Sequence, residues 1–234
     1  MSDVLRLGVA GLGVASTQIL PPISTLPFIK VTAAADTRID ALAKFREAYK
    51  AETFTSVEAM CASSNVDAIY VATPNQLHAQ HAIIAANHKK HVIVEKPMAL
   101  SIEECEAMNQ AAEKNRVNLL CGHTHSFDPP VRKIREIVRS GELGKLCMIN
   151  TWNCNEFMYR PRMKHELATS RGVVLNQGPH HVDIVRLIGG GMVRSVRAMT
   201  GIWDQARAYE GSYTCYLEFE DGTPATLVYS GYGF

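Results

Sequence analysis

The sequence predicts an α/β fold in which a doubly wound parallel sheet is followed by an α+β domain with a mainly antiparallel, open sheet. Two observations predict it. In the first half of the chain, short and nearly continuous apolar runs alternate with segments of helical period, as in a parallel sheet covered by helices on both faces. After about residue 145, apolar and polar residues alternate one by one, which is the period of a half-buried antiparallel strand.

The first domain is predicted to extend from residue 1 to residue 123. Its strands are expected in five apolar runs, at residues 4–10, 29–35, 67–72, 92–94 and 117–122. The first helix should stop at Pro21-Pro22, because proline does not continue a helix. Another helix should begin at Ser101, which has Glu104 at the spacing of a capping box.

The second domain is predicted to extend from residue 124 to residue 234. Residues 212–220 alternate in polarity, Asp221-Gly222 reads as a turn, and residues 225–229 can pair back as the next strand. The sequence stops directly after this strand, so we expect the domain to continue beyond Phe234. An open sheet face of this kind favours a homodimer or homotetramer.

Composition and charge favour a small-molecule partner. The chain has 234 residues, of which 47% are apolar and 20% charged, so it can bury a sizeable core. Its 24 Lys and Arg residues balance 23 Asp and Glu residues, which leaves no electrostatic footprint for nucleic acid or an anionic membrane. We therefore expect a small-molecule substrate, no nucleic-acid partner and no membrane partner.

The N-terminus and the cysteines favour the cytoplasm. Residues 1–10 lack the basic flank and the cleavage site of a signal peptide, and no apolar run reaches the roughly 18 residues of a membrane span. The six cysteines are scattered without any C-x-x-C spacing, which fits reduced thiols.

A glycine-rich turn predicts a dinucleotide site. Residues 8–13 read G-V-A-G-L-G where the first strand meets the first helix, although Ser16 replaces the third glycine of G-x-G-x-x-G. Asp36 ends the second strand, where an acid can bind the ribose hydroxyls of NAD and disfavours the 2′-phosphate of NADP. Arg38, two residues later, is able to accommodate that phosphate, and a plain structural turn is the alternative interpretation.

Three further segments follow predicted strands, at residues 73–75, 95–97 and 122–123. Ligands of open parallel sheets bind at the carboxyl ends of the strands, so these segments are candidate site residues. Lys96 stands between an acid and a proline, which suits a lysine that hydrogen-bonds a reacting oxygen. From position alone, a solvated surface lysine is an equally good interpretation.

With these motifs the sequence resembles the Gfo/Idh/MocA oxidoreductase family. The resemblance rests on the glycine turn, on A-T-P-N-Q-L-H at residues 72–78 and on H-V-I-V-E-K-P-M at residues 91–98. It implies an NAD-binding Rossmann domain, a catalytic Lys96 and a cis Lys96–Pro97 bond, while Asp36 makes NADP less favoured than NAD. The cofactor-binding residues would be Gly11, Leu12, Gly13, Asp36, Arg38, Thr73, Pro74, Asn75, His78, Glu95 and Lys96.

A second family signature falls on residues 176–183, N-Q-G-P-H-H-V-D. The resemblance implies that His180 is the catalytic histidine, acting as general base while Lys96 polarises the same oxygen. Asn176 departs from the family pattern, which has an acid there, so proton transfer falls more heavily on His180. Without the resemblance, a core histidine bonded to backbone is the better interpretation of His180.

Within the family, the sequence shows a finer resemblance to the branch that contains phthalate 4,5-cis-dihydrodiol dehydrogenase. This finer resemblance rests on residues 122–128, 159–162, 182–187 and 229–233. It implies NAD-dependent oxidation of a ring cis-dihydrodiol to a catechol. The substrate-binding residues would be His123, His125, Arg160, Arg162, Asn176, Gln177, His180 and Asp183.

Other functions remain open at this point. A sugar or inositol dehydrogenase of the same family would share the nucleotide residues. A non-catalytic NAD(P)-sensing protein could dispense with Lys96 and His180, whose presence favours an enzyme. A zinc hydrolase is conceivable from His78, His81, His88 and His91, which bracket one helix, and from His123 and His125, which could share a strand face. The spacing of a four-coordinate site is missing, so we expect no metal.

Arg160 and Arg162 flank Pro161, so in an extended chain both side chains would project to one face. Two adjacent carboxylates of a phthalate-type diol are natural partners for two guanidinium groups. Surface ion pairs with Glu156 or Glu166 are the alternative.

Overall fold

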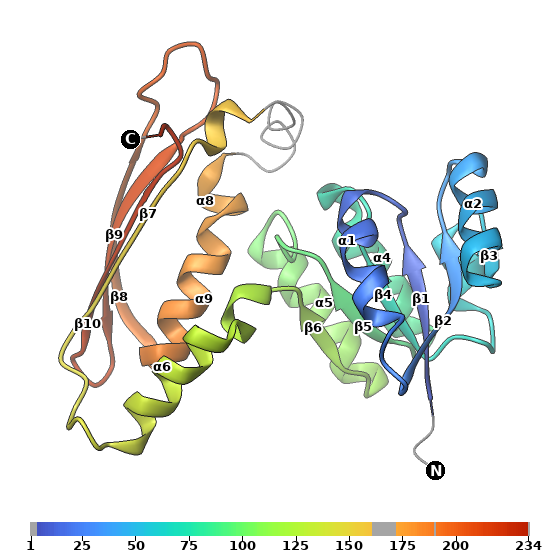
Figure 1. Ribbon diagram of the computed structural model, residues 1–234, viewed down its shortest axis with the longest axis horizontal. Coiled ribbons are helices and arrows are strands. Elements are labelled where there is room, and N and C mark those ends of the chain that lie inside the picture. The colour runs from blue at the N-terminus through green and yellow to red at the C-terminus, as the bar shows by residue number, and fades with distance from the viewer. Residues whose placement is uncertain (1–3, 161–171, 190, 234) are drawn as a thin grey trace. The chain divides into compact units, whose positions relative to one another are not determined.

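The computed structural model describes residues 4–160, 172–189 and 191–233 (Figure 1). The chain divides into two compact units, Met1–Gly122 and His123–Phe234, one residue away from the boundary expected above. Each unit has its own sheet. None of the described helices combines the length and the apolar character needed to cross a membrane.

The first unit contains a six-stranded sheet in the order β3-β2-β1-β4-β5-β6, and every neighbouring pair is parallel, as predicted. Its strands are β1 Leu5–Ala10, β2 Ile29–Ala35, β3 Glu52–Phe54, β4 Ala68–Val71, β5 His91–Val94 and β6 Leu119–Cys121. The strand order reverses direction between β1 and β4. At such a switch point a crevice opens beyond the carboxyl ends of the strands.

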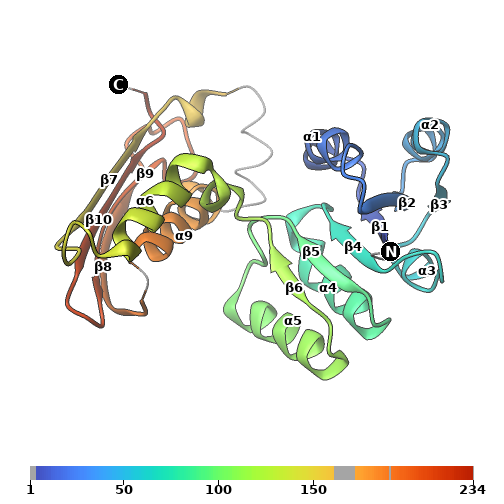
Figure 2. The ribbon, with the colours of Figure 1, turned by 60° about the horizontal axis from the view of Figure 1, so that its bottom comes forward.

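Helices cover both faces of this sheet. They are α1 Val14–Ile23, α2 Ile39–Tyr49, α3 Val57–Cys61, α4 His78–Asn87, which follows the 3₁₀ turn η1 Asn75–Leu77, and α5 Ile102–Asn115. Figure 2 shows α1 and α2 on one face and α3, α4 and α5 on the other. The predicted start of α5 at Ser101 is confirmed, since the Ser101 hydroxyl accepts the N–H of Glu104 at 3.2 Å, but the Glu104 carboxylate accepts the N–H of Leu100 at 2.9 Å and not that of Ser101.

The predicted end of the first helix was wrong. Pro21 and Pro22 lie inside α1, which continues to Ile23. Both prolines fall in the last turn, where few further hydrogen bonds depend on them. Ser24 then closes the helix, because its N–H donates to the carbonyl of Leu20 at 3.0 Å and its hydroxyl donates to the same oxygen at 2.8 Å.

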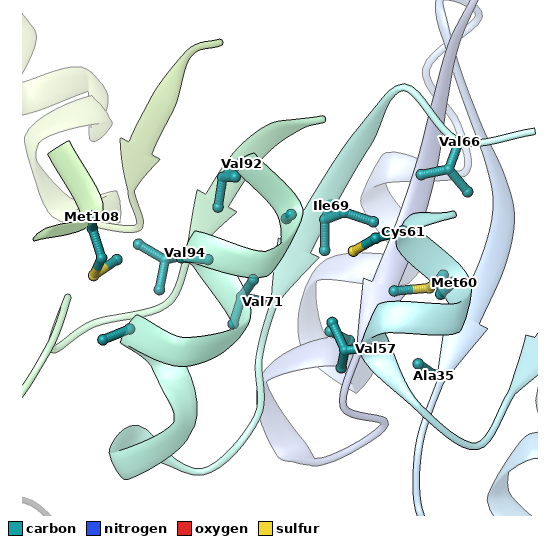
Figure 3. Close-up of a cluster of buried hydrophobic side chains, with 14 of the residues drawn as sticks. Ala35, Val57, Met60, Cys61, Val66, Ile69, Val71, Val92, Val94 and Met108 are labelled. Carbon is teal, nitrogen blue, oxygen red and sulfur yellow. The ribbon is translucent and has the colours of Figure 1, made fainter. Parts of the chain in front are cut away.

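Two apolar cores pack against the two faces of the sheet because successive strand residues point to opposite sides. On one face, α3, α4 and α5 bury Met60, Cys61 and Met108 against Ile69 and Val94 (Figure 3). On the other face, α1 and α2 cover a second cluster, which includes Leu7, Val9, Leu20, Val31, Phe45 and Tyr70. Burial of each large apolar side chain contributes about 1.5 to 3 kcal/mol.

The second unit contains a four-stranded sheet in the order β7-β10-β9-β8. Its strands are β7 Ile149–Cys154, β8 Val193–Gly201, β9 Ser212–Phe219 and β10 Pro224–Ser230. The predicted hairpin of β9 and β10 is confirmed, and β8 pairs antiparallel to β9, whereas β7 pairs parallel to β10. The sheet is therefore mainly antiparallel.

The helices of the second unit lie on one face of its sheet (Figures 1 and 2). The helical segments are η2 Thr124–Phe127, α6 Pro129–Ser140, η3 Phe157–Tyr159, α8 Val173–Asn176 and α9 Gly178–Gly189. On the opposite face, one row across the strands consists of Trp152, Val228, Thr214 and Met199. Trp152 and Met199 are each 69% exposed, and no described helix covers this face.

Candidate active site

The glycine turn between β1 and α1 is shaped for close approach of a ligand. Gly11 has a φ of +91°, and a Cβ at this position would lie 2.6 Å from the carbonyl oxygen of Ala72. Only glycine fits there. Gly13 precedes α1, and a Cβ on it would meet nothing within 4 Å. The first N–H groups of α1 thus lie next to open space, where an anion can bind.

Ser16 occupies the position of the third glycine without opening the turn. It is fully buried, and its hydroxyl donates a hydrogen bond of 2.8 Å to the carbonyl of Gly13. The small hydroxyl is satisfied within the turn, so its burial leaves no polar group without a partner. The departure from G-x-G-x-x-G is therefore compatible with the same backbone path.

Asp36 ends β2 and is tied to the glycine turn. Its carboxylate accepts the N–H of Leu12 at 2.7 Å, the N–H of Arg38 at 2.8 Å and the guanidinium of Arg38 at 3.1 Å. The Asp36 side chain is 8% exposed and that of Arg38 is 55% exposed. Burial opposes ionisation of Asp36, but the hydrogen bonds and the charge of Arg38 outweigh it and lower its pKa.

The segment after β4 lies against the glycine turn, since the backbone of Ala72 and Thr73 limits the space beside Gly11. Pro74 precedes η1, and Asn75 begins it. The hydroxyl of Thr73 lies 3.0 Å from Nδ1 of His81. The sequence placed His78 among the cofactor residues, but its side chain is only 1% exposed and both ring nitrogens contact backbone carbonyls.

The turn at residues 95–97, which we call the Lys96 turn, follows β5 and is fixed by hydrogen bonds of Glu95. The Lys96–Pro97 bond is cis, as the resemblance implied, and Lys96 is half-buried. Glu95 accepts the hydroxyl of Tyr70 at 2.5 Å and the N–H of Lys96 at 3.1 Å. Burial, together with the bond to Glu95, raises the pKa of Tyr70, so its hydroxyl keeps its proton and donates.

Sequence reasoning missed Tyr70. A signal was available, because a tyrosine within the apolar run A-I-Y-V of β4 must find a partner for its hydroxyl when buried. The sequence alone does not say which residue is that partner.

These features fit a dinucleotide. The glycine turn follows β1, the Thr73 segment follows β4 and the Lys96 turn follows β5, three neighbouring parallel strands whose carboxyl ends share one edge. The turn provides the close approach and the helix N-terminus that a pyrophosphate needs, and Asp36 provides an ionised acid beside them. The nucleotide residues predicted from the sequence are thus brought together within the first unit.

The second unit brings three of the predicted substrate residues around His180. The rings of His125 and His180 meet edge to face with centroids 4.6 Å apart, and those of His123 and His180 are 6.4 Å apart. Nδ1 of His123 lies 3.9 Å from a carboxylate oxygen of Asp183. We call these four residues the histidine cluster.

The shared strand face considered above for His123 and His125 does not exist. His123 precedes η2 and His125 lies within it, because β6 ends at Cys121 and the chain turns there. His125 also contacts the carboxylate of Asp128 at 3.1 Å, a neighbour that the sequence analysis did not single out.

Two consecutive histidines of α9 have different environments. His181 is buried, its Nδ1 lies 2.9 Å from the hydroxyl of Tyr213, and burial lowers its pKa. His180 is half-buried beside His123 and His125. Consecutive helix residues point about 100° apart, so one faces the core and the other does not. The core-histidine interpretation therefore applies to His181.

The remaining predicted substrate residues are less closely grouped. Arg160 pairs with Glu156 at 3.0 Å and lies over the ring of Phe157, which is the ion-pair alternative considered above. Arg162 and Glu166 lie outside the described residues. Asn176 is buried and accepts a hydrogen bond from the side-chain amide of Gln177 at 2.7 Å.

In the part of the chain that is described, no group of three or more His, Cys, Asp or Glu residues is arranged to hold a metal ion.

Two family models match the chain. Residues 5–123 match the oxidoreductase family with an NAD-binding Rossmann fold, and residues 131–232 match the GFO/IDH/MocA C-terminal domain. Among solved structures, one from Bordetella bronchiseptica RB50 has a TM-score of 0.93 and 38% identity, and covers 97% of this chain and 61% of its own. The WlbA dehydrogenase of Bordetella pertussis, solved with NADH and UDP-GlcNAcA, has a TM-score of 0.88 and 25% identity over 100% of this chain and 69% of its own.

Curated relatives include two dehydrogenases of ring compounds. A 1-carboxy-3-chloro-3,4-dihydroxycyclohexa-1,5-diene dehydrogenase of Comamonas testosteroni is 40% identical over 97% of this chain and 58% of its own length. A myo-inositol 2-dehydrogenase of Thermotoga maritima is 28% identical over 83% of this chain and 58% of its own length. The chain thus spans less than two thirds of either relative. With both domain models matched in order, the chain belongs to the Gfo/Idh/MocA family of oxidoreductases and begins with its NAD-binding Rossmann domain.

Proposed function

We propose that this protein is an NAD-dependent dehydrogenase that oxidises a carboxylated ring cis-dihydrodiol to a catechol. The observation that carries the proposal is the Lys96 turn, which lies at the same sheet edge as the glycine turn and is anchored through Glu95. The relative at 40% identity, whose name describes a dehydrogenase of a carboxylated cyclohexadiene diol, supports the substrate class.

In the proposed reaction, Lys96 and His180 act on the same substrate hydroxyl group. Lys96 donates a hydrogen bond to the hydroxyl oxygen that becomes a carbonyl, and His180 accepts the proton of that hydroxyl at a ring nitrogen. Bound NAD supplies the acceptor for the hydride from the same carbon. The first product is an enone, which tautomerises to the catechol, and the gain of aromaticity favours oxidation.

Asp36 supports NAD over NADP as the cofactor. Its lowered pKa keeps the carboxylate ionised at neutral pH, where it accepts ribose hydroxyls and repels a 2′-phosphate. The positive charge of Arg38 favours a 2′-phosphate, but its guanidinium already binds Asp36 and the carbonyl of Leu12, the latter at 2.8 Å.

Within the substrate class, we propose a phthalate-type diol with two carboxylates. The histidine cluster supplies several nitrogen donors for a carboxylated ring. The diol named for the Comamonas relative has one carboxyl group, so the number of carboxylates is the finer part of the proposal. The second candidate is an inositol dehydrogenase, which the Thermotoga relative favours.

A substrate panel tests these proposals. Purified protein is assayed for NADH and NADPH formation against dihydrodiols with two, one and no carboxylates, and against myo-inositol and aldoses. Turnover of carboxylated dihydrodiols with NAD is expected. Turnover of inositol alone would establish the second candidate, and NAD binding without any turnover would indicate a sensor.

Two substitutions test the assigned roles. Lys96→Ala should lower kcat by roughly a hundredfold or more while NAD binding is kept, whereas Lys44→Ala, on the exposed face of α2, should change neither. His180→Asn should also lower kcat and remove the acidic limb of the rate profile, because oxidation requires a neutral imidazole. Persistence of that limb in His180→Asn would show that another group is the base.

We also propose that the protein is a cytoplasmic homo-oligomer. The row on the open sheet face, with Trp152 and Met199 exposed, supports burial against a second copy, and six cysteines that form no disulfide with one another support a reducing compartment. Sedimentation of the unaltered protein should give a dimer or tetramer, and Met199→Glu should shift it toward monomer. A monomeric unaltered protein would refute the oligomer.

A further inference from the structure

His78 begins α4 and lies inside the first unit, where its two ring nitrogens contact different segments. Nδ1 is 2.8 Å from the carbonyl oxygen of Pro97, and Nε2 is 2.8 Å from the carbonyl oxygen of Thr73. The imidazole therefore bridges the segment after β4 and the segment after β5. These are the segments that lie beside the glycine turn and carry Lys96.

Both partners of His78 are acceptors only, which restricts its protonation. A neutral imidazole has one N–H donor, so one of its nitrogens would direct a lone pair at a carbonyl oxygen 2.8 Å away. That arrangement is repulsive and leaves a buried acceptor without a donor. An imidazolium has two donors and satisfies both carbonyls.

Two effects oppose a charge at this place, and the two hydrogen bonds must outweigh them. Burial penalises a cation, the N-terminus of α4 carries partial positive charge, and the ammonium of Lys96, one residue before Pro97, adds a like charge to the same region. Against this, hydrogen bonds from a charged donor are roughly twice as strong as neutral ones, and His78 makes two of them in a low-dielectric interior.

The titratable groups on the elements around His78 are engaged elsewhere. On α4, His81 lies beside the hydroxyl of Thr73, and burial first, then the charge of His78, lowers its pKa. On the Lys96 turn, Glu95 is bonded to Tyr70 and to the N–H of Lys96. At the start of α5, Glu104 accepts the N–H of Leu100. The two carbonyls are thus the contacts that decide the state of His78.

We propose that His78 is a positioning residue that carries a proton on both ring nitrogens at neutral pH. In that form it fixes the Lys96 turn relative to the Thr73 segment, which lies beside the glycine turn. The chain of contacts is continuous: Gly11 abuts Thr73, the Thr73 carbonyl binds His78, and His78 binds the carbonyl of Pro97 next to Lys96. Its role in turnover rests on the proposed function, whereas its protonation does not.

The protonation is tested directly by nuclear magnetic resonance of the full chain labelled with ¹⁵N-histidine. The signals of His78 are assigned by their loss in His78→Gln, and long-range ¹H–¹⁵N correlations report whether each ring nitrogen bears a proton. Two protonated nitrogens at neutral pH are expected. One unprotonated ring nitrogen would overturn the proposal. If His78→Gln misfolds, the His78 ring signals are assigned in the unaltered protein from nuclear Overhauser contacts to Pro97, and His88→Gln assigns one exposed signal for comparison.

The positioning role is tested by the kinetics of His78→Gln against His88→Gln as the matched control. A glutamine cannot reach two carbonyls on opposite sides, so the Lys96 turn should shift, and a misplacement of about 1 Å costs about a hundredfold in kcat. The KM for substrate should change much less than kcat, and the circular dichroism spectrum should be retained. Equal kcat for the two variants would refute positioning. Doubly protonated His78 in a protein that turns over no substrate would refute only the proposed function.

Discussion

The hydroxyl of Tyr70 donates a hydrogen bond of 2.5 Å to one carboxylate oxygen of Glu95, while the other oxygen accepts the N–H of Lys96 at 3.1 Å. One carboxylate therefore connects the middle of the sheet to the backbone of the Lys96 turn. Tyr70 is 1% exposed, so water does not replace its hydroxyl if it is removed.

Tyr70→Phe should destabilise the protein and slow turnover. Phenylalanine keeps the ring and removes only the hydroxyl, which leaves the Glu95 carboxylate with one donor fewer at a cost of about 1.5 to 3 kcal/mol. Urea denaturation should show this loss, and kcat should fall more than KM rises. Tyr216→Phe, at an exposed tyrosine of β9, is the control and should change neither quantity.

Asp36→Ser should weaken the preference for NAD over NADP by roughly tenfold or more, because a charged acceptor for the ribose is lost and Arg38 is released toward a 2′-phosphate. The ratio of kcat/KM for the two cofactors measures it. Since the pKa of Asp36 is lowered and the 2′-phosphate has its second pKa near 6, the ratio for the unaltered protein should stay constant between about pH 7 and 9. Equal use of both cofactors by the unaltered protein would show that Asp36 does not bind the ribose.

Arg160→Ala should raise KM for a diol with two carboxylates far more than for an uncharged diol, if its guanidinium exchanges Glu156 for the substrate. Glu156→Gln frees the same guanidinium and should lower that KM. An equal rise for charged and uncharged diols would mean that Arg160 serves the fold through Glu156 and Phe157.

Asp67 should contribute acid-sensitive stability. The hydrogen bonds from Arg6 lower its pKa to about 2, against the partial desolvation of the carboxylate. A carboxylate with a lowered folded-state pKa stabilises the fold above about pH 4 and loses that contribution as the pH falls through 2. Because the pair is partly solvent-exposed, Asp67→Asn should cost only about 1 kcal/mol at pH 7. Urea titrations at pH 7 and near pH 2 should differ for the unaltered protein more than for the variant.

The sequence predicted the first unit well because β1, β2 and β4 are mostly buried on both faces and therefore appear as apolar runs, and the edge strand β6 is also apolar in sequence. The exception is β3, whose three residues Glu52–Phe54 are too few to show a period. In the second unit, β9 alternates because one of its faces is buried, whereas β8 is an edge strand whose residues are mostly exposed and carry little pattern.

The candidate site was predicted as a set of residues but not as a set of contacts. Residue types and spacing pointed to Asp36, Lys96 and His180. They do not reveal that His123 and His180, 57 positions apart in the sequence, have rings 6.4 Å apart, because that distance depends on how α9 packs against η2. For the same reason, the sequence did not show that the imidazole of His78 is turned inward.

The parallel pairing of β7 with β10 affects how the second unit is made on the ribosome. Residue 149 pairs with residue 225, and in the described part of the chain β10 is the strand beside β7. At roughly 5 to 20 residues per second, about 4 to 15 seconds pass after synthesis of residue 149 before residue 225 is synthesised. During that time the backbone of β7 can pair with other strands. Growth temperature and chaperone supply should therefore affect correct folding of the second unit more than that of the first.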